Sequence, residues 1–285
     1  MMLGLRVDVD TLFGLSRGVP RLLSLLDELD LKATFFLPMG PDRMGRNVKR
    51  IVKERGLGRS LAPYLRLYSW QTLLAGTVVE TADFSQAGVK MMWKIKRMGH
   101  DVGLHSFDHF RWQNSVNQFS RNELVTEFQR CIESYLSIFG EMPRCWAAPG
   151  WRTTELSLSV EDGLGFDYAS DTRGFAPFYP VFNGISLKTL QVPVTLPTLD
   201  ELIHQGKSSL VLPASGPHVH CAHAEVEGLS RLEWFSQLLR HVLEHGTSVV
   251  SLSALAQSVS DAPGCAVRDG RVPGRTSTVA VQVTE

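Results

Sequence analysis

The stretch that decides the fold is Val102-Gly-Leu-His105-Ser-Phe-Asp-His109. Its short apolar beginning is typical of the end of a buried strand. The two histidines are therefore expected at that strand's carboxyl tip, where the sites of barrels and open α/β sheets gather. Imidazole nitrogen is the commonest protein ligand for zinc-like ions, so His105 and His109 are candidate metal ligands. Two histidines four residues apart can also be unrelated surface residues, so the interpretation depends on what the other strand tips carry.

A second polar tip lies at the start of the chain, where Asp8-Val-Asp10 follows the apolar run from Leu3 to Val7. Two carboxylates two residues apart on a strand point the same way, and each raises the pKa of the other unless a cation relieves the repulsion. One aspartate can then bind a metal while the other stays free as a base. Asp10 with the two histidines gives a two-His, one-carboxylate set with open positions for water and substrate. The alternative is that both acids cap the helix that follows.

The third polar tip is His223, which ends a strand-like run from Val219 and leads into an acidic turn with Glu225 and Glu227. A histidine facing the same site could act as a general acid. A lone histidine at such a position is also commonly structural, and the two glutamates can be ordinary surface acids. Glu225 and Glu227 are otherwise candidates either for holding His223 or for meeting substrate hydroxyls.

Together the three tips resemble the motifs of the polysaccharide deacetylase superfamily, carbohydrate esterase family 4. The resemblance implies an α/β fold, a distorted and incomplete (β/α)7 barrel, and one divalent metal ion such as zinc, manganese or cobalt. It assigns Asp8 as the general base and His223 as the general acid, with the metal held by Asp10, His105 and His109. Which aspartate is the base follows from this resemblance and not from the spacing.

Longer colinear blocks between residues 3 and 255 sharpen the resemblance to one branch of the family. That branch removes the formyl group from undecaprenyl-phosphate-linked 4-deoxy-4-formamido-L-arabinose. The resemblance thus implies a hydrolase that gives the free amino sugar for lipid A modification and polymyxin resistance. The blocks include Gly18-Val-Pro-Arg-Leu22, Gly40-Pro-Asp-x-Met-Gly-Arg46, Leu73-Leu-Ala-Gly-Thr77, Gly150-Trp-Arg152, Ser170-Asp-Thr-Arg-Gly174, Pro193-Val-Thr-Leu-Pro-Thr198 and His223-Ala-Glu-Val-Glu-Gly228.

Three other functions are compatible with the same residues. An N-deacetylase of another sugar or glycan in this superfamily would share the whole site. A non-catalytic metal-binding module on this fold would be expected to have lost Asp8 or His223, and both are present. A non-haem iron oxygenase can use the same ligand trio, but it needs no free aspartate beside the metal.

One position departs from the superfamily pattern, whose third motif carries an arginine that orients the base. This chain has Ala147 there, so the orienting role is expected at Arg152 or Arg173, or is absent. Asp171 and Arg173 could form a supporting pair at a strand tip. Trp151 is a candidate for the pocket wall that separates formyl from acetyl groups; a buried core tryptophan is the alternative.

Composition indicates an ordinary globular chain, with 44% hydrophobic and 20% charged residues in 285. The formal net charge is zero, which gives no general attraction to nucleic acid. We see no leader-like start and no run of eighteen apolar residues, so a cytoplasmic location is expected. Residues 1–261 are predicted to form the catalytic domain. Residues 262–285, rich in Pro, Gly, Ser and Thr, are predicted to form a mostly disordered tail.

Residues 41–77 interrupt the alternation of strands and helices. Eight Lys or Arg residues between Arg43 and Arg66 are followed by apolar and aromatic residues. One interpretation is a packed helical insertion; the other is a segment lying on the anionic inner face of the cytoplasmic membrane, beside the lipid-linked substrate. The membrane-interface candidates are Leu65, Leu67, Tyr68 and Trp70.

Elsewhere the hydrophobic periodicity predicts strands and helices in alternation. Strands are expected at residues 3–9, 33–37, 102–105, 144–148, 165–169, 190–196, 219–223 and 248–252. Helices are expected at residues 18–30, 86–98, 121–139, 154–164 and 229–245.

Overall fold

A curved parallel sheet forms the centre of the computed structural model, which describes residues 1–43 and 83–284. Seven strands follow one another in the order β10-β1-β2-β3-β4-β5-β8, and β9 also pairs with β1. The strands are β1 (Met2–Asp8), β2 (Thr34–Leu37), β3 (Asp101–Leu104), β4 (Cys145–Trp146), β5 (Tyr168–Ala169), β8 (Leu190–Gln191), β9 (Pro217–His223) and β10 (Ser248–Ser251). All of these pairings are parallel, so the carboxyl ends of the strands gather on one side of the sheet.

β1 is the strand around which this sheet is built. It pairs with β9 along its whole length, from Met2 opposite Pro217 to Asp8 opposite His223. Its first half also pairs with β10, and its last three residues pair with β2. A strand that changes neighbours partway along belongs to a strongly distorted barrel.

The barrel is open between β8 and β9. No strand pairing crosses this gap among the described residues. It is bridged at Thr195 and Leu196, whose N–H groups donate to the Val219 carbonyl at 3.3 and 3.1 Å, while Val219 N donates to Thr195 Oγ1 at 3.0 Å. The prediction of an incomplete, distorted barrel is therefore confirmed. The strand expected at residues 190–196 shrinks to β8, because its second half turns toward β9.

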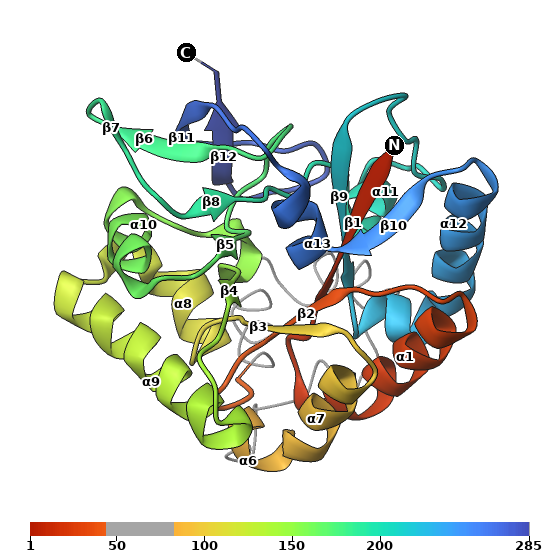
Figure 1. The fold of residues 1–285 in the computed structure, drawn as a ribbon, viewed down its shortest axis with the longest axis horizontal. Coiled ribbons are helices and arrows are strands. Elements are labelled where there is room, and N and C mark those ends of the chain that lie inside the picture. Colours follow the sequence, from red (N-terminus) through yellow and green to blue (C-terminus); the bar gives the residue numbers. More distant parts are fainter. Residues whose placement is uncertain (44–82, 285) are drawn as a thin grey trace, which may run out of the picture.

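Helices cover the outer face of the sheet, and Figure 1 shows α1, α7, α9 and α12 on that side. α9 illustrates how the sequence fixes its boundaries: Ser120 and Glu123 form a capping box at its start, and Gly140 ends it with a left-handed conformation. The helices are α1 (Val19–Glu28), α6 (Phe84–Ala87), α7 (Val89–Arg97), α8 (His109–Ser115), α9 (Arg121–Phe139), α10 (Glu155–Glu161), α11 (Leu199–His204), α12 (Leu232–Glu244) and α13 (Leu252–Ser258). None of these described helices is both long enough and apolar enough to span a membrane.

An aromatic cluster fixes the short strand β4 against α9. The Trp146 ring lies 4.4 Å from the Phe128 ring and 5.1 Å from the Trp112 ring, between centroids. All three side chains are fully buried. Burial of such large apolar surfaces holds β4 in place even though it has only two residues, and it thereby fixes the tip at Ala147 beside β3.

The predicted disordered tail at residues 262–285 is wrong. Two strands, β11 (Gly264–Gly270) and β12 (Val279–Val283), pair antiparallel with each other. β11 also pairs with β6 (Tyr179–Phe182), which pairs with β7 (Ile185–Ser186), so a second sheet is built from two distant segments. The composition misled the prediction because short strands with small and polar residues lack the alternation of a half-buried strand.

The predicted insertion at residues 41–77 lies almost entirely outside the described residues. The same holds for its membrane-interface candidates Leu65, Leu67, Tyr68 and Trp70. The chain re-enters the described part at Asp83, which forms a bridge with Pro41.

Candidate active and metal site

Three side chains converge at the carboxyl tips of β1 and β3. Asp10 follows β1, His105 follows β3, and His109 begins α8, whose first turn is capped by Asp108. Asp10 Oδ1 lies 3.2 Å from His109 Nε2 and 3.6 Å from His105 Nε2. The three ligand atoms lie within 4.8 Å of one another.

The chemistry of this trio fits a divalent cation. His105 Nδ1 contacts the Ala147 carbonyl oxygen at 2.6 Å, which places the proton on Nδ1 and leaves the Nε2 lone pair facing Asp10. Among the described residues, Asp10 Oδ1 and His105 Nε2 are buried without a hydrogen-bond partner of ordinary geometry. Burial raises the pKa of Asp10, but His109 and His105 outweigh burial and hold the pKa well below its usual range. An ionised carboxylate and two imidazole nitrogens are donors that zinc and related ions accept.

Asp8 is held by Arg6, a residue that the sequence analysis did not single out. Both side chains project from the same face of β1. Arg6 Nε and Nη2 donate to Asp8 Oδ1 and Oδ2 at 2.6 and 2.7 Å. Burial raises the pKa of Asp8, but Arg6 and, to a smaller extent, His105 outweigh burial and lower it. The signal for Arg6 was present in the sequence as a single charged residue inside an otherwise apolar strand.

His223 ends β9 directly opposite Asp8. Burial lowers the pKa of His223, but Asp10, Asp200 and Asp8 outweigh burial and raise it to about 9. With no cation on Asp10, these carboxylates favour the protonated imidazole at neutral pH. A protonated histidine beside an ionised aspartate is an arrangement that can supply one proton and accept another.

A second group of possible ligands consists of Asp8, Cys221 and His223, whose ligand atoms also lie within 4.8 Å of one another. Its carboxylate already accepts two hydrogen bonds from Arg6. Burial raises the pKa of the Cys221 thiol, and Asp8 raises it further. A guanidinium cation on the carboxylate and a protonated thiol both oppose cation binding, so the Asp10 trio is the better metal site.

The two glutamates after His223 support the backbone of the site. Glu225 Oε1 accepts hydrogen bonds from Asp10 N at 3.1 Å, from Thr11 N at 2.8 Å and from Thr11 Oγ1 at 2.8 Å. Glu227 Oε2 accepts from His223 N at 2.8 Å. Of the two glutamates considered for holding His223, Glu227 makes the hydrogen bond to it, and Glu225 fixes the turn that carries Asp10.

Asp171 and Arg173 lie near the site but do not pair with each other. Asp171 accepts from Ala148 N at 2.7 Å and from Gln191 Nε2 at 2.7 Å, so it fixes the segment whose Ala147 carbonyl contacts His105. Arg173 pairs with the buried Glu201, and the predicted pair between Asp171 and Arg173 is therefore wrong.

The predicted orienting roles of Arg152 and Arg173 are also wrong. Arg152 Nη1 donates to the Thr278 carbonyl at 3.3 Å, and Arg173 is occupied by Glu201. Trp151 is buried, and the guanidinium groups of Arg6 and Arg173 lie 5.4 and 5.0 Å from its ring centroid. Trp151 therefore packs against the arginine that holds Asp8.

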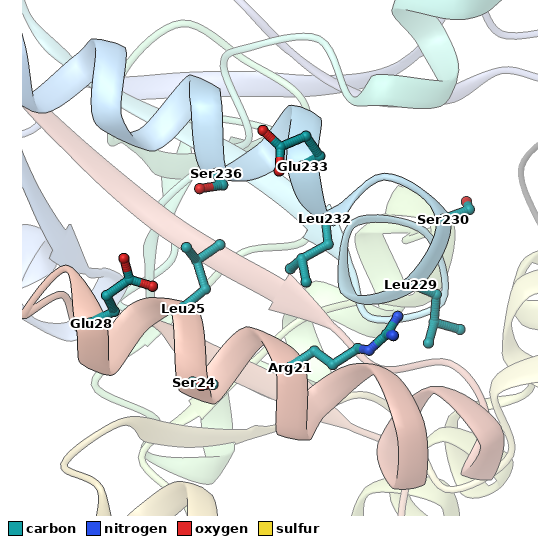
Figure 2. A pocket seen from close by; sticks show the side chains of 9 residues that line it. All are labelled: Arg21, Ser24, Leu25, Glu28, Leu229, Ser230, Leu232, Glu233 and Ser236. Atoms are coloured by element: carbon teal, nitrogen blue, oxygen red, sulfur yellow. The ribbon is translucent and has the colours of Figure 1, made fainter.

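A groove on the outer surface lies apart from this site. Figure 2 shows Arg21 and Leu25 of α1 facing Leu229 and Leu232, at the end of η5 (Val226–Ser230) and the start of α12. None of the nine residues that line it belongs to the candidate site.

A two-histidine, one-carboxylate trio beside a second carboxylate and a histidine is an arrangement of the kind that metal-assisted hydrolases use. The family model described as "Polysaccharide deacetylase" matches residues 5–169, more than half of the 285 residues. The chain therefore belongs to the polysaccharide deacetylase family and is a hydrolase that acts on an amide bond.

Curated relatives support the assignment over most of the chain. The chain is 32% identical, over 262 residues, to the "Probable 4-deoxy-4-formamido-L-arabinose-phosphoundecaprenol deformylase ArnD" of Shewanella sediminis (strain HAW-EB3), covering 88% of this chain and 85% of the relative. It is 30% identical, over 282 residues, to the protein of the same name from Wigglesworthia glossinidia brevipalpis, covering 94% and 98%.

Solved structures confirm the fold. A crystal structure assigned as a polysaccharide deacetylase from Mycobacterium smegmatis matches with a TM-score of 0.63 at 17% identity, covering 95% of this chain and 94% of the other. The Bc1960 peptidoglycan N-acetylglucosamine deacetylase matches with a TM-score of 0.53 at 15% identity, covering 91% and 90%. At these identities the likeness concerns the fold alone.

Proposed function

We propose that the chain is a metal-dependent deformylase that removes the formyl group from undecaprenyl-phosphate-linked 4-deoxy-4-formamido-L-arabinose. The single observation that supports the chemistry best is that the Asp10 trio lies beside an ionised Asp8 and a protonated His223. The substrate comes from the names of the two curated relatives. The product would be the free amino sugar used in lipid A modification and in resistance to cationic antimicrobial peptides such as polymyxin.

An amide resists hydrolysis because its carbon is a weak electrophile and its amine is a poor leaving group. Asp10, His105 and His109 would hold a divalent ion, which supplies a Lewis acid at the formyl oxygen. Zinc, manganese and cobalt all accept this donor set.

The proton transfers would be carried out by Asp8 and His223. Asp8 would accept a proton from the attacking water as the new C–O bond forms at the formyl carbon. His223 would donate a proton to the sugar nitrogen as the C–N bond breaks, which releases formate and the amine. General acid and base groups typically contribute about 10²–10⁴-fold each in rate.

The test is mass spectrometry of a formamido-arabinose lipid and its acetamido counterpart after incubation with the protein. We expect loss of the formyl group, loss of activity after chelation, and recovery when a divalent ion is added back. Turnover of the acetamido lipid alone would indicate an N-deacetylase of another sugar. Metal binding without turnover of either would indicate a non-catalytic module.

The lipid tail of this substrate would require the protein to work at the cytoplasmic membrane surface. We propose peripheral binding through Leu65, Leu67, Tyr68 and Trp70, a proposal that rests on the sequence. Basic residues near an anionic surface contribute on the order of 1 kcal/mol each, and inserted apolar side chains add a part that salt does not remove. Flotation with anionic liposomes should show binding that is lost when Leu65, Leu67 and Trp70 become Ser. Equal flotation of both proteins would contradict this proposal and leave the chemistry of the site untouched.

A further inference from the structure

We infer that Arg6 is the positioning residue that fixes the Asp8 carboxylate in the orientation a base needs, an inference that rests on the proposed function of Asp8. Arg152 and Arg173, the two arginines that the sequence suggested for this role, have other partners. The structure places the Arg6 guanidinium on Asp8 from the same strand, β1, two residues away.

The contact between the two side chains has the geometry that fixes a carboxylate plane. Two parallel N–H donors of Arg6 reach the two oxygens of Asp8 at 2.6 and 2.7 Å. A bidentate pair of this kind restrains rotation as well as position, because turning the carboxylate about its own axis breaks both bonds at once. A single ammonium group at the same place would leave that rotation free.

Arg6 is itself held so that it cannot swing away. Its Nη1 donates to the Ser170 backbone carbonyl, and to Ser170 Oγ at 3.1 Å, on the opposite side of the barrel interior. Ser170 Oγ donates in turn to the Val192 carbonyl at 2.6 Å. The guanidinium carbon lies 5.1 Å from the Phe36 ring centroid and 5.4 Å from the Trp151 ring centroid, and the side chain has no exposed surface.

This fixed pair leaves one side of Asp8 available to the reaction. The Arg6 donors occupy one lone pair on each oxygen, and the remaining lone pairs point away from the guanidinium. Asp8 Oδ2 lies 3.7 Å from His105 Nε2, the ligand atom of the metal trio. Asp8 Oδ2 therefore lies beside the candidate metal site, where a base would have to stand to take a proton from a water bound there.

A comparison of two arginine–aspartate pairs tests the inference. On the exposed surface, Arg144 contacts Asp167 with Nε at 2.7 Å and with Nη2 at 2.6 Å, both at the single oxygen Oδ2. We expect Arg6→Lys, which keeps the charge and loses the fork, to lower kcat about 10–100-fold, as for supporting residues of metal sites. Arg6→Gln should lower kcat about 10²–10⁴-fold, as does removal of a base. KM and metal content should be unchanged in both, and Arg144→Lys should behave like the wild type.

A readout without substrate separates this inference from the proposed function. Crystal structures of the metal-loaded wild type and Arg6→Lys should show the Asp8 carboxylate rotated or in several orientations in the variant, with Asp10, His105 and His109 unmoved. An unmoved Asp8 carboxylate, or equal loss of kcat in Arg6→Lys and Arg144→Lys, would overturn the inference. Loss of metal and of thermal stability in Arg6→Lys, without an altered carboxylate, would also overturn it and assign Arg6 a structural role. If the wild type hydrolyses neither formamido nor acetamido sugar, the proposed function fails while the carboxylate comparison still decides the role of Arg6.

Discussion

The neighbouring strands β1 and β9 both end in a pair of acids, but the acids at the two ends differ in their partners and in their pKa values. Each carries acids two residues apart at its carboxyl tip, and the two strands pair in register up to Asp8 and His223. The acids of β1 have cationic or imidazole partners, which hold their pKa values below the usual range. On β9, burial raises the pKa of Glu225 to about 8 and that of Glu227 to about 7. The partner of a carboxylate, more than its place on a strand, decides whether it can act as a ligand or base.

The largest effect is expected when His105 or His109, the two histidines beside Asp10 of the β1 tip, is removed. Replacing His105 or His109 by Ala should abolish metal binding and lower activity by about 10³-fold or more, because a Lewis acid contributes several kcal/mol to amide hydrolysis. Metal analysis and formate release should fall together. His241→Ala on α12, an exposed histidine, is the matched control and should change neither. Full activity in a metal-free His105→Ala protein would exclude the metal trio from the reaction.

The next largest effect distinguishes the role of Asp8 from that of Asp10. Asp8→Asn should keep the metal and lose about 10²–10⁴-fold in kcat, since the amide cannot accept the proton of water. Asp167→Asn, at an exposed arginine pair, is the control substitution. Near-normal turnover by metal-loaded Asp8→Asn would mean that another group is the base.

A smaller effect is expected at the tip of β9. Glu225→Ala removes the acceptor for Asp10 N and Thr11 N, which should lower the free energy of unfolding by about 1–3 kcal/mol. It should also weaken metal binding about 10–100-fold, because the turn that presents Asp10 loses its support. Glu225→Gln keeps an acceptor oxygen and should retain most of the activity. Titration calorimetry with the metal, together with urea unfolding, measures both; equal effects of the two substitutions would show that the charge matters and not the acceptor.

The smallest effect is expected at His100, which lies away from the carboxyl tips of β1 and β9 and affects stability alone. His100 is buried, and Ala33 N donates to its Nδ1 at 3.2 Å. Burial, with a further contribution from Lys32, lowers the pKa of His100 from 6.5 to about 4. Between these two pH values the unfolded chain binds more protons, so stability is fully present above pH 6.5 and falls as the pH drops toward 4.

His100→Asn, whose side-chain oxygen can replace Nδ1 as the acceptor, should remove this part of the acid sensitivity. The expected difference is on the order of 1 kcal/mol, after allowance for solvent screening. Urea unfolding at pH 7 and pH 5 measures it. An unchanged pH slope in the variant would show that other groups cause the loss of stability in acid.

The parts of this molecule that the sequence revealed are those carried by local patterns. The barrel class and the positions of Asp10, His105 and His109 at the carboxyl tips of β1 and β3 follow from short motifs after apolar strands. Contacts between distant segments could not be read in the same way: the bonds from Glu225 to the Asp10 turn depend on the register of β1 and β9.

The C-terminal strands escaped prediction for a related reason. β12 takes its place from residues far earlier in the chain, since Arg173 N donates to the Ala280 carbonyl and Gln282 N donates to the Arg173 carbonyl. A strand that is stabilised by such long-range pairing cannot be predicted from the local sequence pattern. Arg6 was different, because its position inside an apolar strand was visible and its partner two residues away is on the same face.

The placement of Arg6, Asp8 and Asp10 within one five-residue stretch has a consequence for protein engineering. The cation, the base and a metal ligand would travel together in any chimera that exchanges this stretch. On the far side of the barrel, Arg6 depends partly on the backbone carbonyl of residue 170, which any amino acid supplies. A related barrel could therefore receive the proposed base, its cation and one proposed metal ligand as a single graft, and it would still have to supply the two histidines of the trio and a general acid equivalent to His223.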